Sequence, residues 1–172
     1  IAVGALTFRA GLRDGKAEAE RAVTQIARSD AYDYDGADAI MRIANDAALL
    51  RLASPIATHV IPPFSIEPRP LRQGEVSVVS YGRGRDKLPS LQRTCRVLGQ
   101  FEGVMAMDCD TTYGSSGAPV FRQDGARVRI ASIVSGSAVI DGVRRTTGMA
   151  LPDLVVDLKQ RIVAEAVGPR AR

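Results

Sequence analysis

The chain has 172 residues, of which 45% are hydrophobic and 24% charged, a composition typical of a folded globular protein. Its 23 basic and 19 acidic residues give a formal charge of +4, an excess too small to indicate nucleic-acid binding by itself. No apolar run reaches the roughly 18 to 20 residues that cross a bilayer, so we expect no membrane insertion. We interpret the short basic clusters as solvated loops or outward strand faces: Arg83 to Lys87, Arg127 with Arg129, and Arg144 with Arg145.

Short runs of alternating apolar and polar residues recur along the chain, with turn residues between them. In the first run, Leu6, Phe8 and Ala10 alternate with Thr7 and Arg9, as in a strand with one buried face. The predicted strands are residues 5–10, 21–27, 47–52, 75–81, 93–98, 104–108, 118–122, 127–135 and 145–150. This spacing predicts an all-β sandwich or barrel.

Three segments depart from the strand pattern. Residues 35–44 have a weak helical pattern, and Gly36 leaves a loop as an equal alternative. The segment from Pro55 to Pro70 holds five of the nine prolines, which predicts an extended connection. After Pro152, apolar residues at three- and four-residue spacing predict a C-terminal helix: Leu154, Val155, Leu158, Ile162 and Val163.

The two cysteines are Cys95 and Cys109, and neither has a CxxC partner or a neighbouring histidine that would indicate a metal site. If the apolar segments around them form a hairpin that turns near Glu102, the cysteines lie opposite each other at a distance that suits a disulfide. Two buried free thiols are the alternative. We favour the disulfide, which would indicate an oxidising compartment.

The segment Gly114-Ser115-Ser116-Gly117-Ala118-Pro119 carries the strongest chemical signal. A serine between glycines, directly before a strand, can present its hydroxyl group while neighbouring N–H groups converge on an oxyanion. The spacing differs from the G-x-S-x-G turn of α/β hydrolases, because Gly117 follows Ser116 directly. On its own, the segment would be interpreted as an ordinary turn rich in Gly, Ser and Pro, and it is the surrounding sequence that favours catalysis.

Three segments together resemble the trypsin-like serine peptidases, and most closely the bacterial group related to glutamyl endopeptidases. The Ser116 segment resembles their G-[DNS]-S-G-[GSA]-P nucleophile motif. Residues 45–56 are similar to the N-D-[IVA]-A-L-L segment around the triad aspartate, and residues 130–136 to the G-I-V-S strand of the primary specificity pocket. The resemblance implies two antiparallel β-barrels: the remainder of the first over residues 1–60, a connection over 61–74, the second over 75–150 and a helix over 151–165.

The resemblance also implies a role for each matching residue. Ser116 would be the nucleophile of a serine endopeptidase, Asp46 would orient a histidine, and the N–H groups of Gly114 and Ser116 would bind the oxyanion. Ser115 stands where pancreatic enzymes carry an aspartate that pairs with a new N-terminus, so activation by that ion pair is not expected. The activity needs no cofactor and no metal ion.

The catalytic histidine is the departure from the family pattern. The family places it before the aspartate, whereas the only histidine here, His59, follows Asp46 and is interpreted as a structural or surface residue. The chain starts at Ile1 without the features of a signal peptide, so we expect a processed or truncated chain whose histidine lies upstream. The isolated 172 residues are then expected to be inactive.

Primary specificity is predicted from three positions: Asp110, Val134 and Ser135. Asp110 stands where trypsin-like members place the residue at the pocket base, which favours Arg or Lys in the substrate, unless it points away and leaves a small neutral pocket. Val134 replaces the histidine with which related enzymes receive glutamate, so glutamate is expected to be disfavoured.

A catalytically inactive homologue that acts as a binding module is the alternative function. In either case we expect a monomeric protein that is secreted or periplasmic and that binds protein or peptide, not nucleic acid or membrane.

Overall fold

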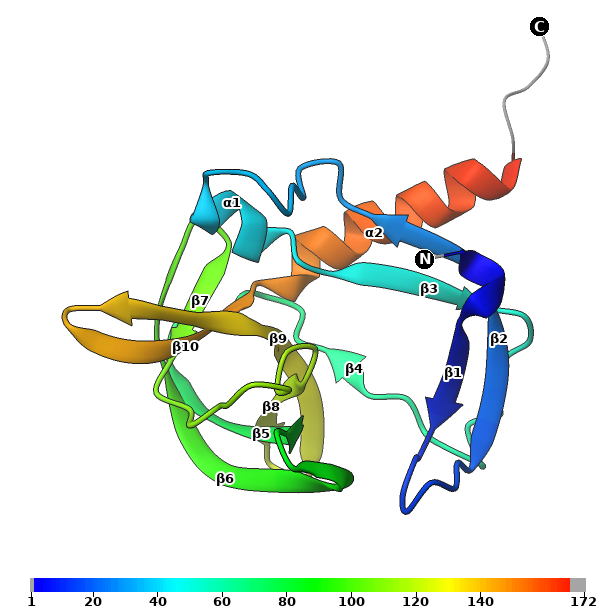
Figure 1. Ribbon diagram of the computed structural model, residues 1–172, viewed down its shortest axis with the longest axis horizontal. Helices are drawn as coiled ribbons and strands as arrows, with labels where there is room; N and C mark the ends of the chain where they lie inside the picture. The colour runs from blue at the N-terminus through cyan, green and yellow to red at the C-terminus, as the bar shows by residue number, and fades with distance from the viewer. Residues whose placement is uncertain (1, 168–172) are drawn as a thin grey trace, which may run out of the picture.

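The computed structural model describes residues 2–167 of the chain (Figure 1). A short 3-10 turn, η1 (Val3–Ala5), precedes the first strand. The strands are β1 (Thr7–Ala10), β2 (Ala19–Arg28), β3 (Ala48–Leu52), β4 (Ser65–Ile66), β5 (Gly74–Gly82), β6 (Arg85–Phe101), β7 (Val104–Met107), β8 (Pro119–Asp124), β9 (Arg127–Ile140) and β10 (Val143–Met149). The helices are α1 (Ala39–Ala44) and α2 (Leu151–Val167). The prediction of a mainly β protein with a C-terminal helix is confirmed.

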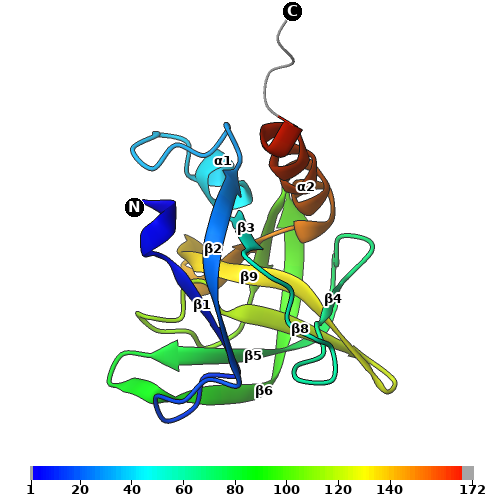
Figure 2. The same ribbon diagram turned by 90° about the vertical axis from the view of Figure 1, so that its right-hand side faces the viewer.

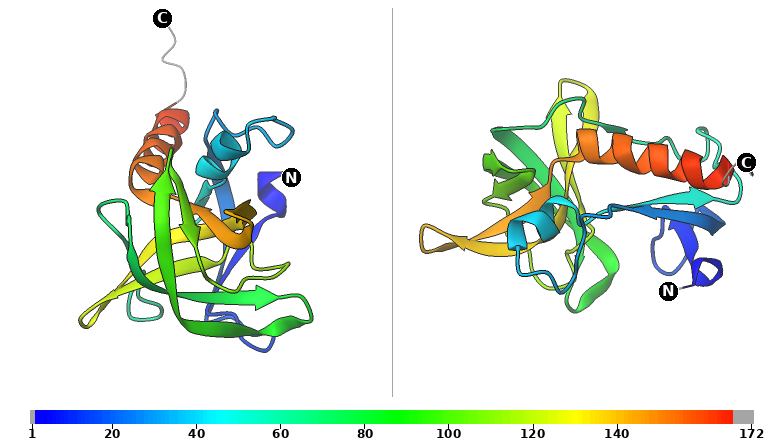
Figure 3. Two further views of the ribbon diagram at one scale, coloured as in Figure 1. Left: turned by 90° about the vertical axis from the view of Figure 1, so that its left-hand side faces the viewer. Right: turned by 90° about the horizontal axis from the view of Figure 1, so that it is seen from above.

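The first half of the chain forms a three-stranded antiparallel sheet in the order β1-β2-β3. Figures 2 and 3 show α2 on one side of β2 and β3, with η1 on the other side. The helix buries Leu158 and Ile162 against Ala27 of β2, with Leu49 of β3 at the edge of the same cluster. The last element of the chain therefore supplies much of the core of the first sheet.

The second half forms a larger sheet that closes on itself. Its strands follow the order β10-β7-β6-β5-β8-β9, and β9 pairs again with β10, so this antiparallel sheet is a closed barrel. β4, from the proline-rich connection, adds to β9 as a parallel strand. Side chains that alternate along the strands fill the barrel, including Val76, Val97, Met105, Met107 and Val120.

The segment with the weak helical pattern contains both a loop and a helix. Gly36 lies in a turn, and its N–H donates a hydrogen bond to the carbonyl of Asp33. Asp38 then caps α1, since its carboxylate accepts hydrogen bonds from the N–H groups of Ile40 and Met41.

The predicted division of the chain at residues 60, 74 and 150 stays a prediction.

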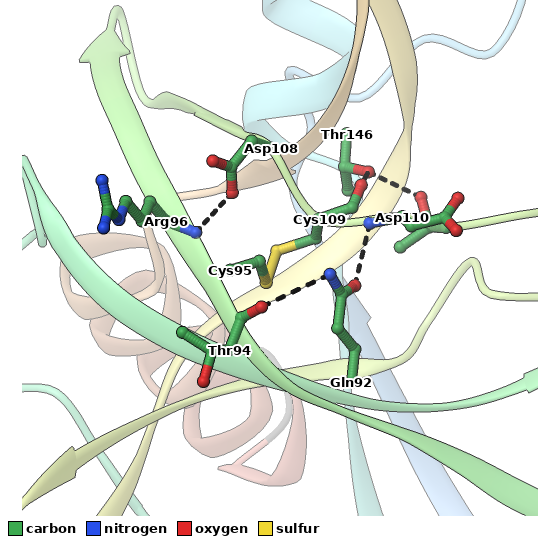
Figure 4. The surroundings of a disulfide bond; sticks show 9 residues. Gln92, Thr94, Cys95, Arg96, Asp108, Cys109, Asp110 and Thr146 are labelled. Atoms are coloured by element: carbon green, nitrogen blue, oxygen red, sulfur yellow. Dashed lines mark hydrogen bonds between the residues drawn. A yellow bond between two sulfur atoms is a disulfide. The ribbon is translucent and has the colours of Figure 1, made fainter.

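Cys95 and Cys109 form the predicted disulfide, with their Cα atoms 5.0 Å apart (Figure 4). The reason is the register of the β6–β7 hairpin, which places Val97 opposite Met107 and so brings the next inward-facing positions together. Both cysteines are buried in the core of the closed barrel. The bond therefore fixes the start of the segment that leads to Ser116.

Replacement of both cysteines by serine is expected to lower the free energy of unfolding by about 3 kcal/mol, because the bond closes a loop of 14 residues in the unfolded chain. Denaturant unfolding monitored by circular dichroism measures the change. Reduction of the unsubstituted protein should have a similar effect. Equal stability of the oxidised and reduced proteins would show that the disulfide does not constrain the unfolded chain.

Candidate active site

Ser116 lies in the loop between β7 and β8, in a turn held by two glycines. Gly114 has φ of 90° and Gly117 has φ of 84°, backbone angles that residues with a Cβ atom rarely adopt. The N–H of Gly117 donates to the carbonyl of Val134 at 2.8 Å, which ties the turn to β9. Ser116 itself is exposed at the surface, and its hydroxyl group donates to the carbonyl of Ser135 at 3.1 Å.

Two backbone N–H groups of this turn have no hydrogen-bond partner among the described residues. Within the described residues, the N–H groups of Gly114 and Ser116 make no hydrogen bond. Ser115, between them, is buried and turned inward, with its hydroxyl group 3.3 Å from that of Ser80. The inward position of Ser115 leaves Gly114 and Ser116 exposed on the outer side of the turn.

Asp46 lies between α1 and β3, and a serine connects it to the Ser116 turn. The N–H of Asp46 donates to the carbonyl of Ile43, so the end of α1 holds its position. The carboxylate accepts a hydrogen bond of 2.6 Å from the Ser135 hydroxyl group. Because the carbonyl of Ser135 also accepts from Ser116, a single residue of β9 contacts both Asp46 and Ser116.

Tyr32 is a further residue beside Asp46 that the sequence did not indicate. It lies in the loop between β2 and α1 and is half-buried. Burial raises the pKa of its phenol, and the negative charge of Asp46 raises it further. No motif of the sequence marks this tyrosine; only the folded loop brings it to the aspartate.

The raised pKa of Tyr32 has a consequence for stability at high pH. Above about pH 10 the unfolded phenol loses its proton while the folded one retains it, so the free energy of unfolding falls as the pH rises. Tyr32→Phe is expected to reduce this fall. Urea unfolding measured at a series of alkaline pH values tests this, with Tyr113→Phe as the control, because Tyr113 is 70% exposed. The same pH dependence in the two variants would contradict the prediction.

A pocket of about 270 Å³ opens next to Ser116. One wall is β9, with Val134 and Ser135, the two residues of this strand that the sequence assigns to the primary pocket. The opposite wall is the segment before the nucleophile, with Thr111 and Tyr113. Arg144 of β10, which the sequence placed on a solvated strand face, also lines the pocket.

The structure does not bring Asp110 to this pocket. Asp110 lines a separate hollow together with Arg85, and its N–H donates to the side chain of Gln92 at 2.8 Å (Figure 4). The next residue, Thr111, makes a different contact. Its hydroxyl group is hydrogen-bonded to that of Thr146, which donates to the carbonyl of Cys109. This arrangement corresponds to the alternative in which Asp110 points away from the primary pocket.

His59 does not complete the site. It is exposed in the connection between β3 and β4, in a turn closed by a hydrogen bond from the N–H of Val60 to the carbonyl of Ala57. It makes no hydrogen bond with Ser116 or Asp46 in the described part of the chain. Residues 2–167 also contain no cluster of acidic, cysteine or histidine side chains that could hold a metal ion, and no helix long and apolar enough to span a membrane.

A closed antiparallel barrel, an exposed serine in a turn with two glycines and a carboxylate connected to it through Ser135 are features typical of the serine peptidase class. The sequence profile of the trypsin-like peptidase domain matches residues 3–130, and the chain belongs to this family. Among solved structures, the chain is similar to a Glu endopeptidase in complex with MPD, with a TM-score of 0.69 and 17% identity over 92% of this chain and 71% of that chain. No curated protein sequence matches significantly.

Proposed function

We propose that this chain is the greater part of a serine endopeptidase that hydrolyses peptide bonds through an acyl-enzyme on Ser116. The observation that carries the proposal is the connection through Ser135, which contacts the Ser116 hydroxyl group with its carbonyl and the Asp46 carboxylate with its hydroxyl group. Membership of the trypsin-like peptidase family supports the same reaction class.

In the proposed reaction, Ser116 Oγ attacks the carbonyl carbon of the scissile peptide and gives its proton to an imidazole. The N–H groups of Gly114 and Ser116 stabilise the negative oxygen of the tetrahedral intermediate. The imidazolium then protonates the leaving amine, and water hydrolyses the acyl-enzyme by the reverse sequence. The attacking water molecule supplies the proton that restores the hydroxyl group of Ser116.

The imidazole is proposed to come from a histidine upstream of Ile1. Asp46 would orient it and stabilise its charged form. The carboxylate has room for this partner, since a carboxylate offers about four acceptor positions and Ser135 occupies one of them. Without that histidine, Ser116 has no general base, and the 172 residues alone are proposed to be inactive.

A catalytically inactive homologue is the second candidate. One observation favours it: the only histidine of the chain, His59, is exposed and makes no hydrogen bond with either Ser116 or Asp46. Such a protein would retain the pocket beside Ser116 and bind peptide without cleaving it.

Labelling of the full-length protein with a fluorophosphonate probe separates the two candidates. Attack by an activated Ser116 displaces fluoride and leaves a covalent phosphonyl group that peptide mass spectrometry can locate. Labelling at Ser116, together with turnover of peptide substrates, is expected for the peptidase. The absence of both from the folded full-length protein would favour the binding module.

The protein is proposed to be secreted or periplasmic and to act as a monomer on protein or peptide substrates. The support for the location is the Cys95–Cys109 disulfide, because such bonds persist mainly in oxidising compartments.

A further inference from the structure

The geometry points to Arg144 as the residue that determines specificity, by receiving an acidic side chain of the substrate residue before the scissile bond. This inference rests on the proposed function, because it names the substrate class of the same site. It assigns to the pocket beside Ser116 a preference for glutamate or aspartate.

The position of Arg144 follows from the pairing of β9 and β10. In this register Thr146 lies opposite Ser137, and Arg144 lies opposite Val139. Successive side chains of a strand point to opposite faces, so Arg144 and Thr146 share one face of β10. Thr146 is bonded to Thr111 of the opposite pocket wall, which shows that this face of the strand is turned to the pocket.

The guanidinium group of Arg144 is held at the pocket by a diagonal contact across the two strands. Its Nε donates a hydrogen bond of 2.9 Å to the hydroxyl oxygen of Ser137. The two Nη groups make no hydrogen bond and no ion pair with the side chains and backbone groups that the structure describes. The group is therefore oriented by one bond and keeps its remaining donors for a ligand.

The lining of the pocket beside Ser116 carries only positive charge. Its lining contains a single charged residue, Arg144, and no carboxylate, because Asp110 lies in the separate hollow with Arg85. A lysine or arginine side chain in this pocket would meet a like charge without a counter-charge. An acidic side chain would meet the only opposite charge available.

The chemistry of the lining suits a carboxylate. A guanidinium group is planar and always charged, and it can donate two parallel hydrogen bonds to the two oxygens of a carboxylate. Ser137 accepts from Arg144, so the proton of its hydroxyl group is free to donate to the same carboxylate. Val134 supplies an apolar wall for the methylene groups of the substrate side chain.

This inference replaces the expectation that glutamate is disfavoured. The basis of that expectation was Val134 alone, which offers no partner for a negative side chain. The sequence could not show that a neighbouring strand places an arginine at the pocket, since the place of β10 beside the Ser116 turn depends on its pairing with β7 as well as with β9.

Peptide substrates that differ only in the residue before the scissile bond test the inference in the full-length protein. The kcat/KM for Glu or Asp is expected to exceed that for Gln, Leu and Lys. Arg144→Ala is expected to lower the ratio of Glu to Gln by about 10- to 100-fold, the effect of one charge-assisted interaction. Arg145→Ala is the matched control, because Arg145 points to the opposite face of β10 and lines a different hollow. It should leave the ratio unchanged.

A binding measurement separates this inference from the proposed function. A fluorescent tetrapeptide that ends in a free C-terminal glutamate mimics the product, and its affinity for the full-length protein does not require turnover. We expect it to bind more tightly than the peptide that ends in glutamine, and Arg144→Ala to remove the difference. Binding of this kind without cleavage of any substrate would overturn the peptidase and support the Arg144 pocket. Cleavage with equal kcat/KM for Glu and Gln, or a preference that survives Arg144→Ala, would overturn the Arg144 pocket and leave the peptidase.

Discussion

Ser116→Ala is expected to lower the peptidase activity of the full-length protein by at least about 10⁴-fold, because the nucleophile and its base act as a unit and the remaining groups only bind and polarise the substrate. The fold should be retained. Ser116 is exposed, and its one hydrogen bond, to the Ser135 carbonyl, does not hold the turn, which the N–H of Gly117 ties to Val134. Active-site titration and kcat measure the loss, and thermal unfolding checks the fold.

Ser54→Ala is the matched control, since Ser54 is exposed in the connection after β3. It should leave kcat unchanged. Full activity of Ser116→Ala, with the fluorophosphonate label on another residue, would assign the nucleophile to that residue.

Asp46→Asn is expected to lower kcat by on the order of 10⁴-fold, because the amide group would favour the wrong tautomer of the imidazole. The asparagine carbonyl oxygen can still accept the hydrogen bond from Ser135, so the connection to the Ser116 turn should persist. The predicted defect is therefore in proton transfer and not in folding. The pH dependence of kcat/KM should show it, as activity lost near neutral pH and partly regained at alkaline pH.

The control for Asp46→Asn is Asp35→Asn, which changes an exposed carboxylate in the loop before α1. It is expected to have the kinetics of the unsubstituted protein. A loss of less than about tenfold in Asp46→Asn would mean that another group orients the imidazole.

The parts of the fold that could be predicted are those with local signals. The alternation of Leu6, Phe8 and Ala10 predicts a strand, and β1 covers Thr7–Ala10. The three- and four-residue spacing around Leu158 predicts a helix, and α2 buries that leucine. The disulfide also depends on a local feature, the short hairpin between Cys95 and Cys109.

The parts of the site that could not be predicted depend on long-range strand pairing. Ser135 joins Asp46 to Ser116 across 89 residues of sequence, a contact that no local pattern contains. The β9–β10 hairpin at Arg144 is local, but the position of that hairpin beside the Ser116 turn depends on the pairing of β10 with β7 and of β9 with β8, and the separation of Asp110 from the pocket depends on its backbone contact with Gln92. Spacing from Ser116 alone could not distinguish a pocket residue from one that faces the adjoining hollow.

The packing of α2 also bears on the order in which the protein can fold during synthesis. Ala27 and Leu49 lie early in the chain, but their core partners Leu158 and Ile162 come from its last helix. During synthesis from the N-terminus, one face of the sheet β1-β2-β3 therefore stays exposed until nearly all of the closed barrel has been made. The strands of the closed barrel, β5 to β10, all precede α2, and most of their pairings join consecutive strands, so the barrel can close before the helix docks on β2 and β3.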